Sequence, residues 1–408
     1  MTLLRITDYT LTSALGRGRG AHLAALTSGT TGLQQHGFDD CQIACWIGEV
    51  PGLDTQLPAE LKQFDCRNHR LAWLGLQQDG FMDGIARLRA KHDANRIGVF
   101  MGTSTAGIHS AELAYRHWRL QGEPNGPLPD WFDYEHTQNL YSVADFVKQA
   151  LRLTGHSLVI STACSSSAKV FAAAYRSMQM GLCDAAIVGG VDSLCLTTLY
   201  GFNSLQLVSS DVCRPADANR RGISIGEAAG FAIVEASQLN DDQYALPYAL
   251  LGYGECGDAH HMSSPDPQGQ GAAMAMQLAL ARAKLKANQV DYINLHGTGT
   301  LANDAAEDKG VTTVFGTGTP CSSTKGWTGH TLGAAGIMEA GVAMLCIEHG
   351  LMPQSLNTQH KDPSLNANIL LNTQRSAVNH VLSNSFGFGG SNCALLLGHV
   401  NAMDAGAT

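Results

Sequence analysis

The chain has 408 residues, 44% of them hydrophobic and 15% charged, with a formal net charge of -9 at pH 7. This composition is typical of a globular protein with a large core and excludes a disordered chain. An acidic chain gains nothing from counterion release, so bulk binding to nucleic acid or to an anionic membrane is not expected.

The cysteines indicate a reduced protein. There are 11 of them, an odd number, without a paired Cys-x-x-Cys spacing, which argues against a disulfide framework and against a structural zinc site. We find no apolar run long enough to cross a bilayer, and the first residues lack a charged segment leading into an apolar signal core. The sequence therefore predicts a cytoplasmic protein with no membrane span, no metal and no cofactor.

Segments typical of strands and helices alternate along the chain. In the first half, strands are predicted at 96–101, 157–161 and 184–190, and helices at 143–153 and 165–180. This alternation predicts parallel sheets that are covered by helices. The second half repeats the scheme, with a helix at 271–287, a strand at 292–295, a helix at 332–349 and a strand at 393–397.

Cys164 stands where the second of these strands turns into a helix, in the run Ser-Leu-Val-Ile-Ser-Thr-Ala-Cys-Ser-Ser-Ser-Ala. A thiol at a helix N-terminus faces unpaired N–H groups and the positive end of the dipole, so we expect a lowered pKa. The same N–H groups can hold an oxyanion. Alone the signal is weak, because most cysteines are small core residues. Two histidines beside glycines, His296 and His330, could each place an imidazole near the thiol.

At these residues the chain resembles the β-ketoacyl-acyl-carrier-protein synthases, the decarboxylating condensing enzymes of the thiolase superfamily. The resemblance implies an α/β protein with the five-layered αβαβα thiolase fold, built from two pseudo-symmetric halves. We expect the nucleophile in a half at 1–250, the two histidines in a half at 251–400, and a flexible tail at 401–408. Besides the two histidine segments, the motifs in the family's order are DVCRPADANRRGISIGEAAG (211–230), DAHHMSSPDPQGQG (258–271) and NSFGFGGSN (384–392).

The resemblance also implies a catalytic role for several residues. Cys164 would take an acyl group from a thioester, while the N–H groups of Cys164 and Phe388 hold the oxyanion. His296 and His330 would donate, as neutral imidazoles, to the enolate that malonyl decarboxylation leaves. We expect the dipole of the helix after His330 to keep that ring neutral. Lys325 and Glu307 match a lysine and its acidic partner, which implies a buried pair that orients a histidine.

Further residues match positions that bind the substrate. Thr298 and Thr300 match threonines that hold the pantetheine arm of the carrier, although they could simply tie the turn. Leu301 stands where relatives have proline, so we expect the loop from Thr300 to bend differently. Phe386 and Phe388 could be core aromatics, but the resemblance makes Phe388 a gate between the carrier entrance and the acyl pocket.

Docking of an acidic carrier protein onto an acidic enzyme requires a local cationic patch. Arg67 and Arg70 occupy a family-like position, and Arg116 and Arg119 would be neighbours on a helix. We predict that these four arginines dock the carrier; an ordinary solvated surface is the alternative.

The sequence thus predicts an acyltransferase, a 3-oxoacyl-acyl-carrier-protein synthase. It would condense a Cys-bound acyl group with malonyl-acyl-carrier protein to give 3-oxoacyl-acyl-carrier protein, carbon dioxide and free carrier. The pathway would be fatty-acid synthesis or a specialised polyketide or aryl-polyene pathway; the segment 6–11, which departs from the family's apolar opening strand, favours the latter. The implied partners are the carrier protein with its phosphopantetheine-linked acyl and malonyl groups, and a second copy of the chain in a homodimer or a related subunit in a heterodimer.

Two alternatives stay open at this point. One is the chain-length-determining subunit of a ketosynthase heterodimer, a class that typically lacks the cysteine. The other is a thiolase-like acyltransferase, a class that usually has a second active-site cysteine near its C-terminus. Cys393 lies near that end, but it stands in an apolar strand, where core packing is the better interpretation.

Overall fold

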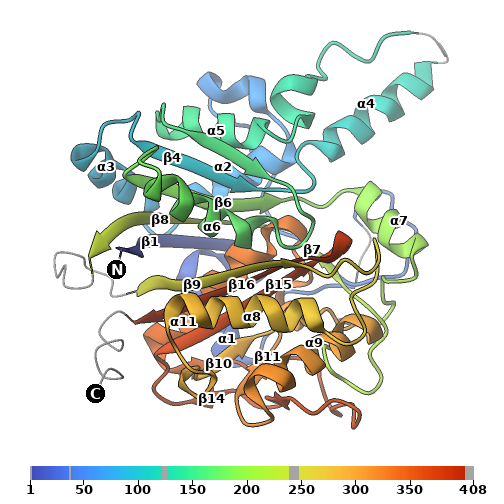
Figure 1. Ribbon diagram of the computed structural model, residues 1–408. Helices are drawn as coiled ribbons and strands as arrows, with labels where there is room; N and C mark the ends of the chain where they lie inside the picture. The colour runs from blue at the N-terminus through green and yellow to red at the C-terminus, as the bar shows by residue number, and fades with distance from the viewer. Residues whose placement is uncertain (1, 36–37, 122–125, 239–247, 400–408) are drawn as a thin grey trace.

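The computed structural model describes residues 2–35, 38–121, 126–238 and 248–399. Ten of its strands form two sets of five that follow the same path (Figure 1). The first set has the order β5-β4-β6-β8-β1 and the second the order β11-β10-β15-β16-β9. The bounds are β1 Thr2–Ser13, β4 Ile97–Gly102, β5 Ser157–Ile160, β6 Ala185–Asp192 and β8 Ala228–Gln238, then β9 Tyr248–Gly257, β10 Tyr292–Asn294, β11 Pro320–Ser322, β15 His380–Gly387 and β16 Ser391–His399.

The two sets also share their strand directions. In the first set, β4 is parallel to β5 and β6, while β8 is antiparallel to both β6 and β1. In the second set, β10 is parallel to β11 and β15, while β16 is antiparallel to both β15 and β9. At one end, β1 and β9 pair over Leu4 to Ile6, which joins the sets into one hydrogen-bonded sheet. The repetition confirms the two pseudo-symmetric halves. The second set starts at Tyr248, and the exact division near residue 250 stays a prediction, while the tail at 401–408 lies outside the described residues.

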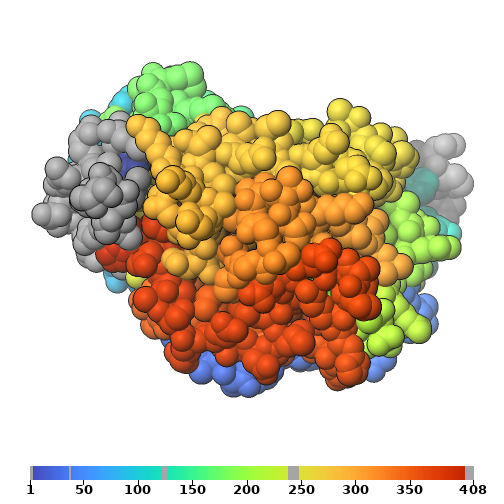
Figure 2. Space-filling model, turned by 60° about the horizontal axis from the view of Figure 1, so that its bottom comes forward, coloured from blue at the N-terminus to red at the C-terminus, as the bar shows by residue number. Residues whose placement is uncertain are grey.

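Helices cover both faces of each set, which produces the five layers (Figure 1). The first set packs on its outer side against α2 (Arg67–Leu76), α3 (Phe81–Lys91) and α5 (Ser142–Leu151). The helices α6 (Ser166–Gln179) and α11 (Ala335–His349) lie in the central layer and contact each other. The second set is covered by α8 (Gln270–Ala283) and α9 (Leu301–Phe315), which lie side by side on the face of Figure 2.

Burial on both faces explains why the central strands read as continuous apolar runs. In β6, Ile187 packs with the outer helices while its neighbour Val188 packs with the central ones. Alternate side chains of a strand point to opposite faces, so a strand between two helical layers needs apolar residues at every position. All eight residues of β6 are accordingly buried.

Helix α11 corrects one expectation. Over Leu332–His349 it is long and apolar enough to cross a membrane, with 18 residues and a mean hydropathy of 1.3, so the expectation that no run reaches this length was wrong. However, 89% of that window is buried inside the protein. A helix that contacts other elements on all sides is hydrophobic all round, and α11 lies between α6 and the strands β8, β15 and β16.

The predicted helices and strands are all present, with ends that differ by a few residues. Several elements were missed. The strands β1, β8, β9, β11 and β15 were not predicted, and neither were the helices α2, α3 and α9; the face pattern of α9 is hardly amphipathic. Smaller elements are α1 (Gly18–Ser28), α4 (Ile108–Gln121), α7 (Leu196–Ser204) and α10 (Lys325–Thr328), the strands β2 (Gly16–Arg17), β3 (Ile47–Gly48), β7 (Ile225–Gly226), β12 (Leu351–Met352), β13 (Asn368–Ile369) and β14 (Gln374–Arg375), and the turns η1 (Ala59–Phe64), η2 (Tyr134–Gln138), η3 (Ala287–Gln289), η4 (Leu332–Ala334) and η5 (Phe388–Gly390).

Candidate active site

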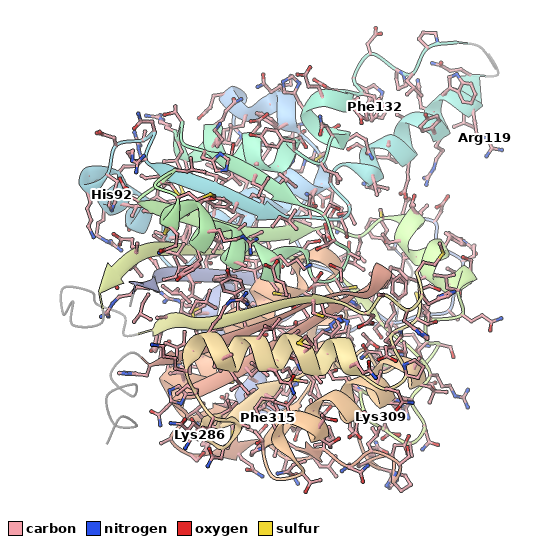
Figure 3. All side chains as sticks on the ribbon, viewed as in Figure 1. His92, Arg119, Phe132, Lys286, Lys309 and Phe315 are labelled. Atoms are coloured by element: carbon pink, nitrogen blue, oxygen red, sulfur yellow. The ribbon has the colours of Figure 1, made fainter. Side chains whose placement is uncertain are left out.

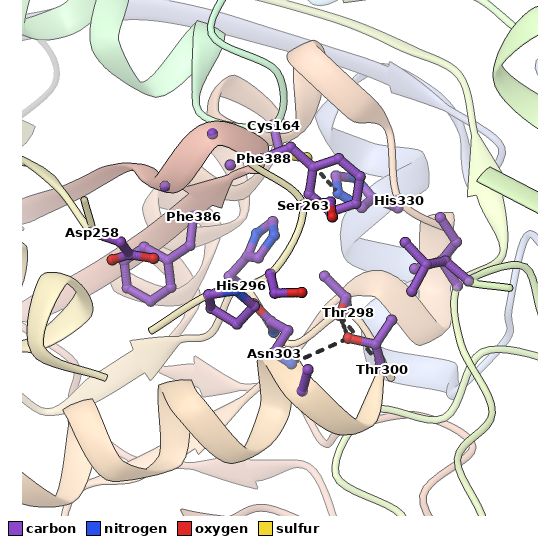
Figure 4. A pocket seen from close by; sticks show the side chains of 18 of the residues that line it. Cys164, Asp258, Ser263, His296, Thr298, Thr300, Asn303, His330, Phe386 and Phe388 are labelled. Carbon is purple, nitrogen blue, oxygen red and sulfur yellow. Dashed lines mark hydrogen bonds between the residues drawn. The ribbon is translucent and has the colours of Figure 1, made fainter. Parts of the chain in front are cut away.

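Cys164, His296 and His330 meet at one point between the halves (Figure 4). Their ligand atoms all lie within 4.8 Å of one another, and Nε2 of His330 lies 3.0 Å from Sγ of Cys164. The two imidazoles contact edge to face, with ring centroids 5.3 Å apart. The exposed fractions are only 5% for Cys164, 2% for His296 and 3% for His330. The three residues that the sequence singled out are thus brought together.

A sharp turn presents the cysteine. Ala163 has φ of 51°, in the left-handed region that L-residues rarely adopt. The turn is fixed by a bond from the N–H of Thr162 to Oγ of Ser166 (2.9 Å), and α6 begins at Ser166. Strain at one residue therefore sets the thiol at the start of the central helix.

His330 is held through its backbone by β7, which belongs to the motif at 211–230. The N–H of His330 donates to the carbonyl of Ser224 (2.7 Å), and the N–H of Gly226 donates to the carbonyl of His330 (3.0 Å). A Cβ at Gly226 would lie 2.1 Å from the carbonyl oxygen of Thr328, so only glycine allows this approach. The segment 224–226 of this motif is thus a backbone support for the histidine.

The expected lowering of the cysteine pKa is wrong. Burial raises the pKa of the Cys164 thiol to about 11, although the charge of Lys325 and the N–H groups of Phe388 and Cys164 act in the opposite direction. Withdrawal from water penalises the thiolate more than the helix start favours it. The same two N–H groups surround Sγ as the sequence predicted for an oxyanion site, although their role stays a prediction. A Cβ at Gly387 would lie 2.9 Å from the carbonyl oxygen of Thr162, so glycine permits this approach as well.

Both histidines are neutral and carry their ring proton on the same nitrogen. The N–H of Leu332 donates to Nδ1 of His330 (3.1 Å), and Nζ of Lys325 lies 3.3 Å from Nδ1 of His296. Each Nδ1 is therefore an acceptor, which assigns the hydrogen to Nε2. Burial, followed by the charge of Lys325, lowers both pKa values well below the ordinary one. The neutral state of His330 was predicted, but its expected cause, the helix dipole, is replaced by these two.

Lys325 pairs with a different carboxylate from the one expected. Its Nζ lies 2.5 Å from Oε1 of Glu339 on α11, and both residues are buried. Glu307 instead accepts the backbone N–H groups of His296 (2.8 Å) and Gly297 (2.7 Å) and the side chain of Asn384 (3.0 Å). The predicted Lys325–Glu307 pair is therefore wrong, because three other donors already use that carboxylate.

Glu339 was missed by sequence reasoning, although a signal existed. It is the one carboxylate in Gly-Ala-Ala-Gly-Ile-Met-Glu-Ala-Gly (333–341), a run that is otherwise small and apolar. A lone charge on a buried helix requires a partner. Burial raises the pKa of Glu339 above its ordinary value. Burial also raises the pKa of Glu307, in this case to about 7.

A pocket of about 720 Å³ leads to the three residues and is lined by Thr298, Thr300, Phe386 and Phe388 (Figure 4). The two threonine hydroxyls bond each other (2.9 Å), and Oγ1 of Thr300 accepts the N–H of Asn303 (3.3 Å). The threonines therefore tie the turn and also face the pocket. Since α9 begins at Leu301, the segment after Thr300 is helical and the expected loop there is wrong.

The two aromatic rings that line the pocket have different neighbours. Phe386 contacts His296, with ring centroids 6.1 Å apart, and Phe388 contacts Phe202 at 5.4 Å. Cys164, His296 and His330 have the geometry of a metal-binding group. However, the Nε2 atoms that face one another carry hydrogens, and a metal ligand needs a free lone pair. The chemistry of the donors thus agrees with the prediction that no metal is bound, which stays a prediction.

Three of the four arginines predicted to dock the carrier are engaged elsewhere. Arg67 reaches the buried carboxylate of Glu227 (2.6 Å) and also Glu49 (2.9 Å), so its charge is already paired, and its docking role stays a prediction. Arg70 pairs with Asp65 (2.6 Å).

The other two arginines lie on α4, as predicted. Arg116 binds Asp39 (3.0 Å) and Asp40 (3.2 Å), while Arg119 is exposed and extends from the projecting helix (Figure 3). Arg116 therefore offers no free charge, and neither the role of Arg119 nor that of the engaged Arg70 and Arg116 is tested by the geometry.

Comparison with known proteins supplies the remaining findings. The family description "Beta-ketoacyl synthase, N-terminal domain" matches residues 70–239, and "Beta-ketoacyl synthase, C-terminal domain" matches residues 249–359. The chain is 30% identical to 3-oxoacyl-[acyl-carrier-protein] synthase 2 of Coxiella burnetii over 97% of this chain and 98% of that one. It is 39% identical to the mitochondrial 3-oxoacyl-[acyl-carrier-protein] synthase of Arabidopsis thaliana over 59% of this chain and 55% of that one.

The structural comparison agrees with these matches. A chain of the solved ketosynthase (ApeO) in complex with its chain length factor (ApeC) from Xenorhabdus doucetiae superposes with a TM-score of 0.89. It is 35% identical, and the match covers 98% of both chains. The likeness extends over both halves, which agrees with the repeated strand order described above.

Proposed function

Because the chain belongs to the β-ketoacyl synthase family, we propose that it condenses a Cys164-bound acyl group with the malonyl group of an acyl carrier protein. The observation that carries this proposal is the position of two imidazole N–H groups next to the thiol of Cys164, just before α6. Acyl transfer alone requires the thiol and an oxyanion site, whereas decarboxylation requires donors for an enolate.

In the first step, Sγ of Cys164 attacks the acyl thioester of the carrier. The N–H groups of Cys164 and Phe388 stabilise the oxyanion. When the intermediate collapses, the acyl group stays on sulfur and the carrier leaves as a thiol with the proton that Cys164 has lost. His330 cannot take that proton at Nε2, since this nitrogen already carries a hydrogen.

In the second step, the thioester oxygen of the malonyl group accepts hydrogen bonds from Nε2 of His296 and of His330. The bond to the carboxylate breaks, carbon dioxide leaves and the electron pair forms an enolate. Neutral imidazoles suit this role because they donate without a proton transfer. The enolate carbon then attacks the acyl carbonyl on Cys164, and collapse returns the thiolate and releases the 3-oxoacyl carrier.

The remaining site residues have supporting roles in this proposal. Lys325 orients His296 and lowers the pKa of both histidines, and Glu339 balances its charge. Glu307 holds the backbone at His296 and Gly297. The proposal also assigns Thr298 and Thr300 to the pantetheine arm, Phe386 to the substrate site beside His296 and Phe388 to the gate.

The alternatives are weaker. A chain-length-determining subunit needs neither the cysteine nor paired N–H donors beside it. A thiolase needs a second cysteine at the site, but Cys393 is fully buried in β16, packed in the central core, and does not line the pocket.

The first half has an exposed sheet edge at which a partner subunit could bind. The strand β5 ends its set, and Leu158 on it is 39% exposed. An unpaired edge of this kind accepts a strand from another chain. We propose that a second copy or a related chain-length subunit pairs here, and the likeness to a chain of a ketosynthase–chain length factor complex supports the heterodimer. We also propose that the two halves divide near residue 250. We propose further that the protein is cytoplasmic and that it acts in a specialised biosynthetic pathway.

The direct test supplies acyl-carrier and malonyl-carrier proteins to the purified chain, with and without a candidate partner subunit. We expect an acyl adduct by intact mass, followed by a carrier extended by a two-carbon 3-oxo unit. An adduct without extension would indicate an acyltransferase. No adduct at any acyl length, with the partner subunit present, would contradict the proposal.

Carrier docking leads to a separate prediction, because the expected cationic patch is largely engaged in ion pairs. Three exposed apolar side chains, here called the apolar rim, lie one or two positions along the chain from residues that line the pocket: Leu205 (50% exposed), Met262 (78%) and Leu301 (63%). A carrier whose arm enters this pocket must rest on its mouth. We therefore expect apolar contacts at the rim to hold the carrier.

The rim is tested with the double variant Met262→Asp/Leu301→Asp. Loss of two apolar contacts, at about 1.4 kcal/mol for each tenfold in affinity, should raise KM for carrier-linked substrates about tenfold or more. Small acyl-cysteamine thioesters should react as before. Met180→Asp is the matched control, since Met180 is 66% exposed but follows the far end of α6 from Cys164. Equal losses with both substrate types, or no change in KM, would contradict docking at the rim.

A further inference from the structure

Asp192, the last residue of β6, is fully buried and accepts an unusually complete set of hydrogen bonds. They join the ends of β4 and β6, in the first half, to the turn after His330. The donors are Oγ1 of Thr103 (2.7 Å), N and Oγ of Ser104 (2.7 and 2.5 Å), N and Oγ1 of Thr105 (2.9 and 3.0 Å) and N of Gly333 (2.5 Å).

The last of these bonds lies one residue from the contact that fixes the histidine. Gly333 follows Leu332, whose N–H donates to Nδ1 of His330 (3.1 Å). Leu332 has φ of 54°, a conformation that a leucine adopts only when its surroundings hold it there. A Cβ at Gly333 would lie 2.7 Å from Oδ2 of Asp192, so the turn is packed directly against this carboxylate.

Two ends of one short turn are thus tied, one to Asp192 and the other to His330. If the bond to Gly333 were lost, Leu332 could relax to a negative φ and its N–H would turn away from Nδ1. The imidazole would then be free to place its hydrogen on either nitrogen. Only the form with hydrogen on Nε2 presents a donor toward Cys164.

We propose that Asp192 is a positioning residue that keeps His330 in the Nε2–H form through the Leu332–Gly333 turn. The effect on the reaction rests on the proposed function, because the Nε2 hydrogen matters when an enolate forms. The bonds to Thr103, Ser104 and Thr105 anchor the carboxylate in the first half. Asp192 therefore couples the half that carries the nucleophile to the half that carries the histidine.

The test uses Asp192→Asn in protein labelled with 15N in the histidine rings. An amide keeps the size of the carboxylate but accepts at one oxygen only, so it cannot serve all of these donors. In the unaltered protein, the His330 shifts should report an unprotonated Nδ1 and a protonated Nε2. In the variant, they should move toward a mixture of both forms. Malonyl decarboxylation should fall in proportion to the lost Nε2–H form, up to about 100-fold, the smallest loss typical of a removed oxyanion donor, while acylation of Cys164 changes less than about threefold.

Asp217→Asn is the matched control. Asp217 is 1% exposed and accepts the N–H groups of Asn219, Gln359 and His360, but it does not touch the turn at 331–333. It should leave the ring shifts of His330 unchanged. A purely structural role for Asp192 predicts equal losses of acylation and decarboxylation, with the histidine shifts intact, and that result would overturn the proposal.

The proposal stays testable if the variant does not fold. A hydrogen on Nδ1 of His330 in the unaltered protein would by itself refute it. If the unaltered protein instead shows the Nε2–H form but never decarboxylates a malonyl carrier, the proposed function fails while the positioning role stands.

Discussion

Replacing Cys164 by alanine is expected to abolish the acyl adduct and to reduce condensation by a factor on the order of 10⁴ or more. The variant should still release carbon dioxide from a malonyl carrier. The reason is that the thiol supplies the covalent bond, whereas the donors for the enolate are Nε2 of His296 and of His330. Intact mass measures the adduct, and chromatography separates acetyl-carrier from 3-oxoacyl-carrier.

A cysteine variant away from the pocket provides the control. Cys393→Ala removes a buried sulfur from β16 and should cost about 1 kcal/mol in the free energy of unfolding while preserving the adduct. Condensation that survives Cys164→Ala would refute the nucleophile. Decarboxylation that disappears together with the adduct would show that the histidines do not act independently of the thiol.

The second large effect is expected at the buried Lys325–Glu339 pair. Glu339→Leu leaves the Lys325 charge without its partner at a residue that is 1% exposed. Removing one member of a buried ion pair typically costs about 3–5 kcal/mol, because the other charge stays uncompensated. Urea unfolding should show this loss. Lys325→Met/Glu339→Leu should recover most of the stability, since apolar residues can replace a buried pair.

In Lys325→Met/Glu339→Leu, decarboxylation activity should stay low although the free energy of unfolding recovers. Without Lys325, Nδ1 of His296 loses the donor that assigns its hydrogen to Nε2, so decarboxylation should stay low. Acylation of Cys164 should be affected less, because its oxyanion donors are backbone groups. A doubly substituted protein that is stable and fully active would refute the orienting role of Lys325.

A double-mutant cycle distinguishes this pair from the one that the sequence predicted. Coupling between positions 325 and 339 should exceed coupling between 325 and 307, measured with Glu307→Gln, because Lys325 bonds Glu339 and Glu307 bonds other donors. The reverse order would restore the Lys325–Glu307 pair.

These pairs show which parts of the site could be predicted from local sequence and which could not. Cys164 and the two histidines stand in short glycine-rich or small-residue segments, where a turn, its neighbours and its functional group are encoded together. Glu339 was missed because its partner lies 14 positions earlier, on another element. The order of residues does not indicate that α11 passes beside Lys325, the first residue of α10. The same reason explains why the ion pair of Arg67 was not foreseen, since its partner Glu227 is distant in sequence.

The pKa of Cys164 could not be obtained from sequence either. A helix N-terminus favours a thiolate, and the sequence correctly located that start. The opposing effect depends on how completely neighbouring segments withdraw the thiol from water, and only packing determines this. For His330 the neutral state was predicted correctly, but burial and the charge of Lys325 cause it.

The sequence by itself determined the α/β alternation and the three residues that meet at the pocket, whereas the two pseudo-symmetric halves were implied by the family resemblance. Periodicity and turn-forming residues act over a few positions, so they are legible in order along the chain. Only the tertiary structure decided which carboxylate neutralises Lys325, which nitrogen of each histidine carries hydrogen and which arginines remain available. Those outcomes depend on contacts between residues of different elements, whose energies arise only when the layers pack and exclude water.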